Sequence, residues 1–372
     1  MNMMSRLLQT LMLCTALGAL AAGPDSVAKS DRSLWPDKLD SSKGFDRASR
    51  AEILVFADAL NQLARQDDLK AELHLKSVDA ASVAKISERL SATLLSNYRE
   101  ASTACDGKEI LCDKLASAAD LARSGAALDT QLPAPYQPWL ANARAFHRLY
   151  AMELLRLAAL FPKVSSEIDV FSPAEKTGFE LADRHFLFTF DDGPTAKGGS
   201  TDALLDTLKQ NQIHAMFYML GDHLKPRSDA DAALKQRYDG QCVALHGWEH
   251  QSHQKWADWQ NSVLNTQKLA QQVFGEAYRP YFRPPYGQRR PDSAAFFAQN
   301  QLQVALWNID SQDWNAKISD VEAAQRVMSL MLLWRRGVIL FHDIHPKANR
   351  AVPWLVKSLA GSGVSWDRCQ QY

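Results

Sequence analysis

Residues 186–194 read Phe-Leu-Phe-Thr-Phe-Asp-Asp-Gly-Pro, and this stretch decides the fold class of the second half of the chain. The aromatic and β-branched residues over 186–190 are typical of a short buried strand. Two adjacent carboxylates, Asp191 and Asp192, follow it and precede a Gly-Pro break. Their mutual repulsion is unfavourable unless a cation or a proton lies between them. We expect a strand that ends at a polar, functional edge; an ordinary Asp-Asp-Gly-Pro surface turn is the alternative.

Similar apolar runs recur toward the C-terminus, separated by segments with helical periodicity. Strands are expected at 215–219, 243–245, 281–283, 304–309 and 338–341, and helices at 201–211, 259–274, 320–334 and 351–359. Strand alternating with helix over this length predicts an α/β domain whose parallel sheet closes into a barrel. In such barrels the functional residues follow the C-terminal ends of the strands.

A second polar motif follows the expected strand 243–245 and reads Leu-His-Gly-Trp-Glu-His over 245–250. His246 and His250 are four residues apart, so both rings can reach one ion from the same face of a helical turn. One carboxylate and two imidazoles are usual protein ligands of a catalytic zinc-like site. Asp192, His246 and His250 are therefore the predicted metal ligands, with a pair of exposed histidines as the alternative.

Three further strand ends carry polar residues. They are the segments 283–287 (Arg-Pro-Pro-Tyr-Gly), 310–314 (Asp-Ser-Gln-Asp-Trp) and 342–343 (His-Asp). Each could be structural on its own, because an arginine on a strand end is often a barrel-rim salt bridge and a His-Asp pair can be a structural hydrogen bond. The convergence of five such segments on one edge of the expected barrel favours a reactive site.

These five segments, in this order, resemble the signature motifs of the NodB-like polysaccharide deacetylases, carbohydrate esterase family four. The resemblance extends from about residue 184 to the C-terminus and implies a distorted, partly open (β/α) barrel. It also implies a hydrolase that removes N-acetyl groups from N-acetylhexosamine polysaccharide (peptidoglycan, poly-N-acetylglucosamine or chitooligosaccharide) by attack of metal-bound water. The implied cofactor is a divalent metal, zinc by default, although the same ligands accept cobalt or nickel.

The resemblance assigns a role to each matched residue. Asp191 matches the general base, and Arg283 matches the arginine that orients it. His342 matches the general acid, and Asp310 matches the carboxylate that tunes this histidine. The remaining matches are the backbone N–H of Tyr286 as oxyanion donor, and Trp314 and Leu340 as the apolar wall for the acetyl methyl group.

One position departs from the family pattern. Gly247 follows the first histidine, where the family usually has Ser or Thr. That hydroxyl braces the loop rather than binding the metal, so the ligand set stays intact. The departure weakens any inference about the rigidity of the loop or the choice of substrate.

The first half of the chain has a different pattern. Between about residues 45 and 165 apolar residues recur at helical spacing and glycine is scarce, which predicts an all-α domain. The expected organisation is a signal peptide over 1–22, a linker over 23–44, a helical domain over 45–165 and a deacetylase domain over 180–372. The resemblance leaves the role of the helical domain open.

The N-terminal residues are typical of an export signal. Arg6 precedes an apolar run over 7–20, and small residues at 19 and 21 form a cleavage pattern. We expect cleavage after Ala21 or Ala22 and a periplasmic or extracellular location. The alternatives are an uncleaved anchor, disfavoured because the run is short for a ~30 Å hydrocarbon core, and a lipoprotein signal at Cys14.

Cysteine usage agrees with export. Removal of the signal leaves Cys105, Cys112, Cys242 and Cys369. An even count in an exported protein favours disulfides, and these residues allow three pairings. We favour Cys105–Cys112, which closes a short loop, together with Cys242–Cys369, which would tie the end of the chain to a central strand.

Charge and composition restrict the partners. Lys+Arg and Asp+Glu both count 42, so the formal net charge is zero and gives no general attraction for nucleic acid or anionic membranes. We expect a glycan substrate, no nucleic acid and no stable membrane insertion after signal cleavage, and leave protein partners open. Two other functions remain: a catalytically inactive glycan-binding or scaffold protein, and a hydrolase of a non-glycan amide on the same barrel.

Overall fold

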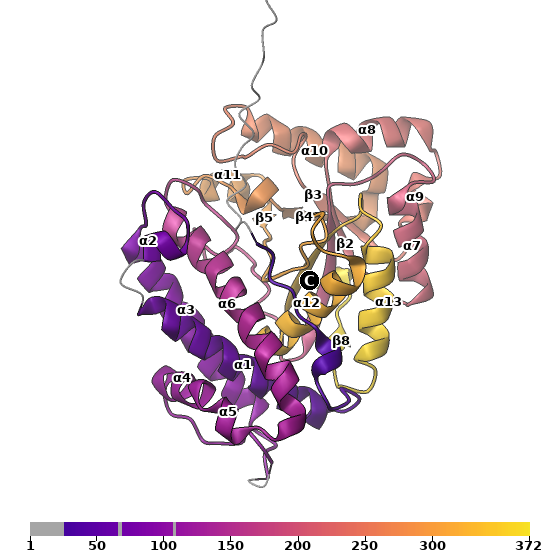
Figure 1. The fold of residues 1–372 in the computed structure, drawn as a ribbon. Coiled ribbons are helices and arrows are strands. Elements are labelled where there is room, and N and C mark those ends of the chain that lie inside the picture. The colour runs from indigo at the N-terminus through magenta and orange to yellow at the C-terminus, as the bar shows by residue number, and fades with distance from the viewer. Residues whose placement is uncertain (1–25, 66–68, 107–108) are drawn as a thin grey trace, which may run out of the picture.

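The computed structural model describes residues 26–65, 69–106 and 109–372 (Figure 1). The expected signal peptide lies outside the described residues. Among the helices of the described ranges, none is long and apolar enough to cross a membrane. Figure 1 shows a helical N-terminal part, in indigo to magenta, along one side of a mixed strand–helix part in rose through orange to yellow.

The N-terminal part is helical, as expected. Its elements are η1 (Arg32–Leu34), α1 (Ser42–Ala64), α2 (Leu69–Glu72), α3 (Ala80–Ala101), α4 (Ala118–Ala126), α5 (Leu128–Gln131), η2 (Ala134–Tyr136) and α6 (Gln137–Leu160). The long helices begin at the capping residues that their sequences provide: the side chains of Ser41 and Asp79 accept hydrogen bonds from the first turns of α1 and α3. Ser117 forms a capping box with Asp120 at the start of α4.

Helix α1 is the centre of this part and contacts α3, α4, α6 and α12. It is buried along almost its whole length, including the charged side chains of Arg50 and Glu52. Gly125 of α4 allows the closest approach, because a β-carbon there would lie 2.1 Å from the carbonyl oxygen of Leu54. Larger residues at this position would therefore separate the two helices.

The second part contains one eight-stranded parallel sheet with helices around it. Its strands are β1 (His185–Asp191), β2 (Met216–Met219), β3 (Cys242–Leu245), β4 (Tyr278–Phe282), β5 (Gln303–Val304), β6 (Ile309–Asp310), β7 (Gly337–His342) and β8 (Ser365–Trp366). Its helices are α7 (Ser200–Gln210), α8 (Gly221–Ala230), α9 (Leu234–Arg237), α10 (Trp259–Phe274), α11 (Ala294–Gln299), α12 (Asp320–Trp334) and α13 (Ala348–Ser358), with short turns η3 (Gly275–Ala277), η4 (Pro285–Gly287) and η5 (Cys369–Gln371).

The sheet is curled into an incomplete barrel. The strand order is β5-β4-β3-β2-β1-β7-β6, and β8 pairs with the first residues of β1. The two edge strands, β5 and β6, follow each other in sequence, yet β5 pairs only with β4 and β6 only with β7. The expected fold class, a distorted, partly open (β/α) barrel preceded by helices, is confirmed.

The single strand expected over 304–309 is wrong in one respect, because the structure divides it into β5 and β6. Val304 pairs with Phe282 of β4, whereas Ile309 pairs with Ile339 of β7. Residues 305–308 cross from one edge of the sheet to the other, and among them Ala305 forms an isolated parallel β-bridge with Lys176. An apolar run alone does not reveal such a crossing. We call this crossing, residues 305–308, the barrel seam.

The helical part and the barrel share one hydrophobic core. Phe56 of α1 contacts Trp334 of α12 edge to face, with ring centroids 5.7 Å apart. Glu153 of α6 forms a buried ion pair with Arg326 of α12 at 2.6 Å. Burial of both charged groups without this pairing would be strongly unfavourable, so the contact holds the two parts in one arrangement.

Part of the expected linker is packed into this interface. Ala28 and Trp35 are buried, and the hydroxyl oxygen of Ser30 lies 2.7 Å from that of Ser329 in α12. Arg32 forms a buried ion pair with Glu52 of α1. The described residues 26–41 are therefore an ordered component of the interface.

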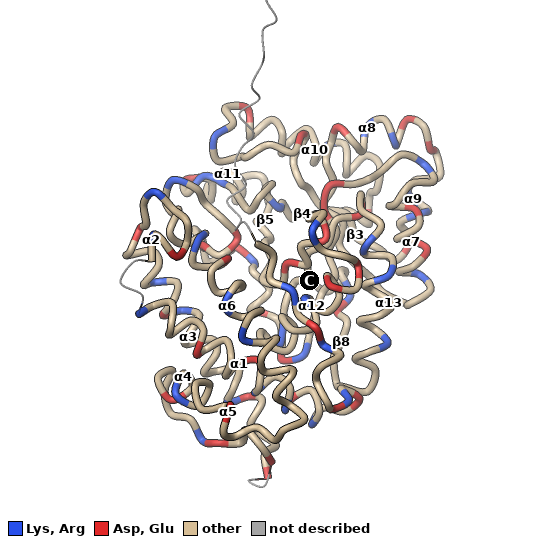
Figure 2. Tube along the Cα trace, viewed as in Figure 1, with Lys and Arg blue, Asp and Glu red and all other residues tan. Residues whose placement is uncertain are grey.

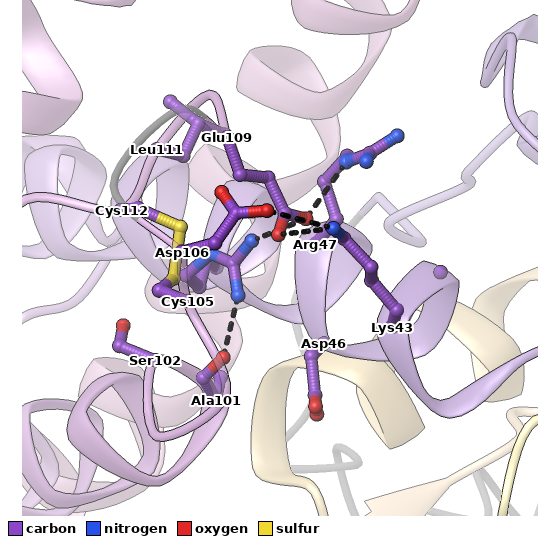
Figure 3. A network of polar contacts seen from close by, with 12 residues as sticks. Lys43, Asp46, Arg47, Ala101, Ser102, Cys105, Asp106, Glu109, Leu111 and Cys112 are labelled. Atoms are coloured by element: carbon purple, nitrogen blue, oxygen red, sulfur yellow. Dashed lines mark hydrogen bonds and ion pairs between the residues drawn. A yellow bond between two sulfur atoms is a disulfide. The ribbon is translucent and has the colours of Figure 1, made fainter.

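Both expected disulfides are present, so the favoured pairing is confirmed. Cys105–Cys112 closes the short loop, and Cys242–Cys369 connects β3 to η5. Figure 3 shows the first disulfide beside Glu109, toward which Lys43 and Arg47 extend from α1. Glu109 pairs with Arg47 at 3.0 Å and with the buried Arg50 at 2.9 Å, and this network fastens the loop to the helical core.

Charged residues of both signs alternate over the whole trace (Figure 2). Neither the helical part nor the barrel shows a continuous segment of one sign. This distribution agrees with the zero formal net charge.

Candidate metal centre and catalytic site

The three expected metal ligands converge at the C-terminal ends of β1 and β3. The Oδ1 atom of Asp192 lies 3.3 Å from Nε2 of His246 and 3.5 Å from Nε2 of His250. The ligand atoms of all three residues lie within 4.8 Å of one another. Asp192 Oδ1 is buried and has no hydrogen-bond partner, which is the state expected of a ligand atom reserved for a cation. The donor set therefore fits a zinc-like divalent ion.

Neighbouring groups fix the orientation of these side chains. Nδ1 of His246 donates to the carbonyl oxygen of Arg283 at 2.7 Å, so Nε2 is the nitrogen turned toward Asp192. Nδ1 of His250 lies 3.2 Å from the hydroxyl of Tyr286. Asp192 has a left-handed backbone, with φ of +80°, and its carbonyl accepts a hydrogen bond from His223 at 2.7 Å. These contacts align both imidazoles and the carboxylate before any ion binds.

The electrostatics also suit a cation site. Burial alone would raise the pKa of Asp192, but the nearby His246, His342 and His250 hold it well below its usual range. Burial and the neighbouring His246 lower the pKa of His250 to about 4. At neutral pH the site therefore offers an anionic carboxylate and a neutral imidazole at His250, the protonation states that metal binding requires.

Asp191, the expected base, lies beside the ligands and is buried to 2% exposure. Its Oδ2 is 3.8 Å from Nε2 of His246, and its Oδ1 accepts a hydrogen bond from Arg283 at 2.8 Å. The same Arg283 nitrogen donates to the hydroxyl of Thr189, two residues earlier on β1. Arg283 therefore holds one oxygen of Asp191, and the second oxygen of Asp191 faces the ligand group.

Arg283 also bridges the barrel seam. Its Nε donates to the carbonyl of Ala305 at 3.2 Å, and its second terminal nitrogen donates to the carbonyl of Leu306 at 2.9 Å. The guanidinium lies 3.9 Å from the ring centroid of Tyr218, and the residue is completely buried. The carbonyl oxygens of Ala305 and Leu306 are therefore satisfied by the residue that holds the expected base.

The partner of His342 differs from the expected one. Nδ1 of His342 lies 2.8 Å from Oδ1 of Asp313, and its backbone N–H donates to Oδ2 of the same residue at 3.0 Å. Asp310, the expected partner, instead accepts two hydrogen bonds from Gln312. The reason is the left-handed turn at Gln312, with φ of +58°, which directs Asp313 to His342. The assignment of Asp310 is corrected to Asp313.

The pKa values of Asp310 and His342 are shifted by different causes. Burial raises the pKa of Asp310. Burial alone would lower the pKa of His342, but its ion pair with Asp313 and the nearby Asp192 and Asp191 raise it to about 10. At neutral pH His342 is therefore protonated, which is the state that a proton donor needs.

The loop after β4 places Tyr286 at the opening of the site. Tyr286 adopts a left-handed backbone (φ 60°, ψ 14°) between Pro285 and Gly287, and half of the residue is exposed. Trp314 is also exposed, to 43%, whereas Leu340 is buried. The two aromatic residues therefore stand at the rim and Leu340 lies inside.

The expected site residues line one cavity of about 820 Å³, apart from Arg283, which holds Asp191 from behind. Its walls come from three parts of the chain. The barrel contributes the ligands, Asp191, Tyr286, Asp310, Trp314, Leu340 and His342. Helices α3 and α6 contribute an apolar wall that includes Leu90 and Leu154, and residues 165–168 contribute a polar one.

Asp313 and residues 165–168 were absent from the sequence-based expectation. Asp313 stands in the same polar segment as Asp310, and only the turn at Gln312 decides between them. Residues 165–168 follow α6 and precede the barrel, and no motif identifies them. Their two serines, one glutamate and one isoleucine are typical of an ordinary connection between domains.

The substitution at Gly247 has a structural explanation. Gly247 has φ of +93°, and a β-carbon there would lie 2.6 Å from Cε1 of His253. The hydroxyl of Ser262 in α10 accepts a hydrogen bond from the backbone N–H of Trp248 at 2.7 Å and lies 3.1 Å from Nε2 of His253. A hydroxyl from α10 therefore braces the loop that lacks one of its own.

Comparison with known proteins places this site in a family. The sequence profile of the family described as polysaccharide deacetylase matches residues 180–305. The peptidoglycan-N-acetylglucosamine deacetylase of Bacillus cereus is 30% identical over 223 residues, which cover 58% of this chain and 78% of that protein. The chain therefore belongs to the polysaccharide deacetylase family, and the expected class of enzyme, a polysaccharide N-deacetylase, is confirmed.

The names of two further relatives refer to different polymers. The peptidoglycan-N-acetylmuramic acid deacetylase PdaC of Bacillus subtilis is 30% identical over 178 residues, covering 47% of this chain and 36% of that protein. Chitin deacetylase 2 of Saccharomyces cerevisiae is 31% identical over 170 residues, covering 42% and 49%. The chain spans less than half of each of these two proteins.

Proposed function

We propose that the protein is an exported, metal-dependent hydrolase that removes N-acetyl groups from a polymer of N-acetylated hexosamine. The observation that carries this proposal is the convergence of a cation-binding triad, a buried carboxylate and a protonated histidine on one cavity. The names of the relatives support a peptidoglycan or chitin-like substrate. Two disulfides support export, since disulfides persist in oxidising compartments.

Asp192, His246 and His250 would hold the metal. A divalent ion bound there supplies a Lewis acid for the amide carbonyl and lowers the pKa of bound water toward about 7. Zinc is the expected ion, and cobalt or nickel suit the same ligands.

The remaining residues act on protons and charge. Asp191 accepts a proton from the attacking water through the oxygen that faces the ligands, while Arg283 holds its other oxygen. The backbone N–H of Tyr286 donates to the oxyanion as the carbonyl becomes tetrahedral. His342, protonated and held by Asp313, donates a proton to the leaving amine.

The apolar residues position the acetyl group. Leu340 lies inside the cavity and Trp314 at its rim, so the methyl group would pack between them. The exposed ring of Tyr286 offers a flat surface for the apolar face of a pyranose.

The test is acetate release by the metal-loaded mature protein from peptidoglycan, poly-N-acetylglucosamine and chitooligosaccharides. We expect release from at least one of these glycans and loss of release after chelation. No release from any of them by protein that binds metal would support an inactive glycan-binding protein instead. Release only from a non-glycan amide would support the other alternative function.

A further inference from the structure

Residues 165–168, which we call the connector, lie directly on the loop that carries Tyr286. The hydroxyl of Ser165 accepts a hydrogen bond from the backbone N–H of Arg289 at 2.9 Å and donates to its carbonyl at 2.8 Å. A β-carbon at Gly287 would lie 2.6 Å from the backbone nitrogen of Glu167. The connector therefore contacts the backbone next to the expected oxyanion donor, although it belongs to the chain that leaves the helical part.

Buried arginine contacts fix the connector in place. Arg289 donates to the carbonyls of Ser166 at 2.8 Å and Asp169 at 2.6 Å, and it forms an ion pair with Glu175. Arg89 of α3 donates to the carbonyl of Ile168. The helical part and the barrel each hold one side of this segment, so its side chains are presented to the cavity in a defined arrangement.

Three polar groups that line the cavity have no side-chain partner among the described residues, and the carboxyl group of Glu167 has only a hydrogen bond with its own backbone. The hydroxyl of Ser166 is buried to 1% exposure and makes no hydrogen bond, and the indole N–H of Trp307 is buried to 8% exposure in the same condition. The carboxyl group of Glu167 forms no hydrogen bond or ion pair with any side chain of the described ranges. All three residues line the same cavity as the metal ligands.

These groups suit a neutral, hydroxyl-rich ligand. Burial raises the pKa of Glu167 to about 8, so at neutral pH this side chain is mostly protonated and can both donate and accept. A hydroxyl does both as well, and an indole N–H donates only. An acyl chain would offer none of these groups a hydrogen-bond partner, which is unfavourable for buried polar groups. A sugar is therefore favoured over an apolar occupant.

The cavity is larger than the reacting group needs. Its volume of about 820 Å³ lies within the usual range of small-molecule pockets, about 300–1,000 Å³, which exceeds the requirement of one acetamido group. Leu90 and Leu154 of the helical part line the same cavity. The cavity therefore has space for a second sugar ring besides the reacting group.

We propose that Ser166, Glu167 and Trp307 form a binding subsite for the sugar unit next to the one that is deacetylated. This inference rests on the proposed glycan deacetylase activity and adds a requirement for at least two linked hexosamine units. It also gives the helical part a function, because α3 and α6 complete the subsite and hold the connector. Glu167 and Ser166 are binding residues in this proposal and take no part in proton transfer.

The experiment compares N-acetylglucosamine with its β-1,4-linked disaccharide and tetrasaccharide, by acetate release from zinc-loaded protein. We expect wild type to have a much higher kcat/KM on the disaccharide than on the monosaccharide. Glu167→Ala should raise KM for the disaccharide about tenfold or more, as for a lost buried hydrogen bond. Glu167→Gln should retain most of the affinity, because an amide also donates and accepts.

Two further variants make the result specific. Ser166→Ala, like Glu167→Ala, should raise the KM for the disaccharide. It tests the subsite independently if Glu167→Ala fails to fold. Glu88→Ala removes an exposed carboxylate of α3 that does not line the cavity, and it should match wild type.

Equal kcat/KM on the mono- and disaccharide in wild type, or an unchanged disaccharide KM in folded Glu167→Ala and Ser166→Ala, would overturn the subsite while leaving the deacetylase proposal intact. Absence of acetate release from every glycan in wild type would instead refute the activity itself.

Discussion

Both carboxylate oxygens of Asp313 bind His342, Oδ1 at its ring Nδ1 (2.8 Å) and Oδ2 at its backbone N–H (3.0 Å). One completely buried side chain thus holds both the imidazole and the end of β7. The ring is held with Nε2 as the nitrogen free to meet a leaving amine. Asp313 is a positioning residue for the proposed acid.

Replacement of Asp313 by Asn should shift the pH profile. The pKa of His342 is raised to about 10, and Asp313 is the largest raising influence, opposed by burial. A general acid works in its protonated form, so activity falls as pH rises through this pKa. Without Asp313 the pKa drops, and the alkaline limb of kcat should move to lower pH. Asp310→Asn is the matched control, and a larger shift in that variant would favour the original assignment.

Replacement of Asp191 by Asn should remove activity and leave metal binding intact. General bases contribute about 10²–10⁴-fold to the rate, and Asn cannot accept a proton from water. Acetate release should fall by that factor or more, while the metal content measured by mass spectrometry stays at the wild-type value. Near-normal turnover in the variant would show that another group is the base.

Replacement of Asp192 by Ala should abolish metal-dependent stabilisation. Because the triad exists only in the folded state, a metal at about a hundredfold excess over its Kd stabilises the protein by about 2.7 kcal/mol. Zinc should therefore raise the Tm of chelator-treated wild type and leave that of the variant unchanged. An equal rise in both proteins would place the tight site elsewhere.

Replacement of Arg283 by Ala should destabilise the fold as well as the site. It leaves the Asp191 carboxylate buried without its partner and two seam carbonyls unsatisfied. Breaking a buried ion pair costs about 3–5 kcal/mol, measurable by urea unfolding. Arg350→Ala is the control, because the side chain of Arg350 is 80% exposed in its ion pair with Asp320 and its loss should cost about 1 kcal/mol or less.

The two disulfides should contribute unequally to stability. Chain entropy predicts about 2.5 kcal/mol for Cys105–Cys112, with a sequence separation of 7, and about 5 kcal/mol for Cys242–Cys369, with a separation of 127. Paired Cys→Ser variants of each bridge should reproduce this order in denaturant unfolding. A larger loss from the short bridge would show that the Glu109 network depends on it.

The strand ends could be predicted because their chemistry is local. Asp191 and Asp192 directly follow a buried apolar run, and so do His246 and His250. This local pattern predicts a position at the C-terminal edge of a parallel sheet without knowledge of the rest of the fold. Helices α10 and α12 have the expected bounds for the same reason, since their periodicity lies within one segment.

The features that escaped prediction depend on geometry between segments. Asp310 and Asp313 are equally plausible partners for His342 until the left-handed residue Gln312 is known. The crossing at 305–308 exists because two sheet edges meet, and the connector reaches the cavity only because Arg289 lies on a loop more than a hundred residues away in sequence. Residue type alone does not encode these distances.

Arg283 has a structural role in the barrel and a role in the site, and both affect how the sequences of distant relatives are interpreted. One guanidinium spans the barrel seam and also holds the expected base. A descendant that abandoned catalysis would still need this arginine to satisfy the carbonyls of Ala305 and Leu306, whereas the side chain of Asp191 binds neither of them. The presence of the arginine in a distant sequence is therefore evidence of shared architecture, and the aspartate beside it is the better marker of a working enzyme.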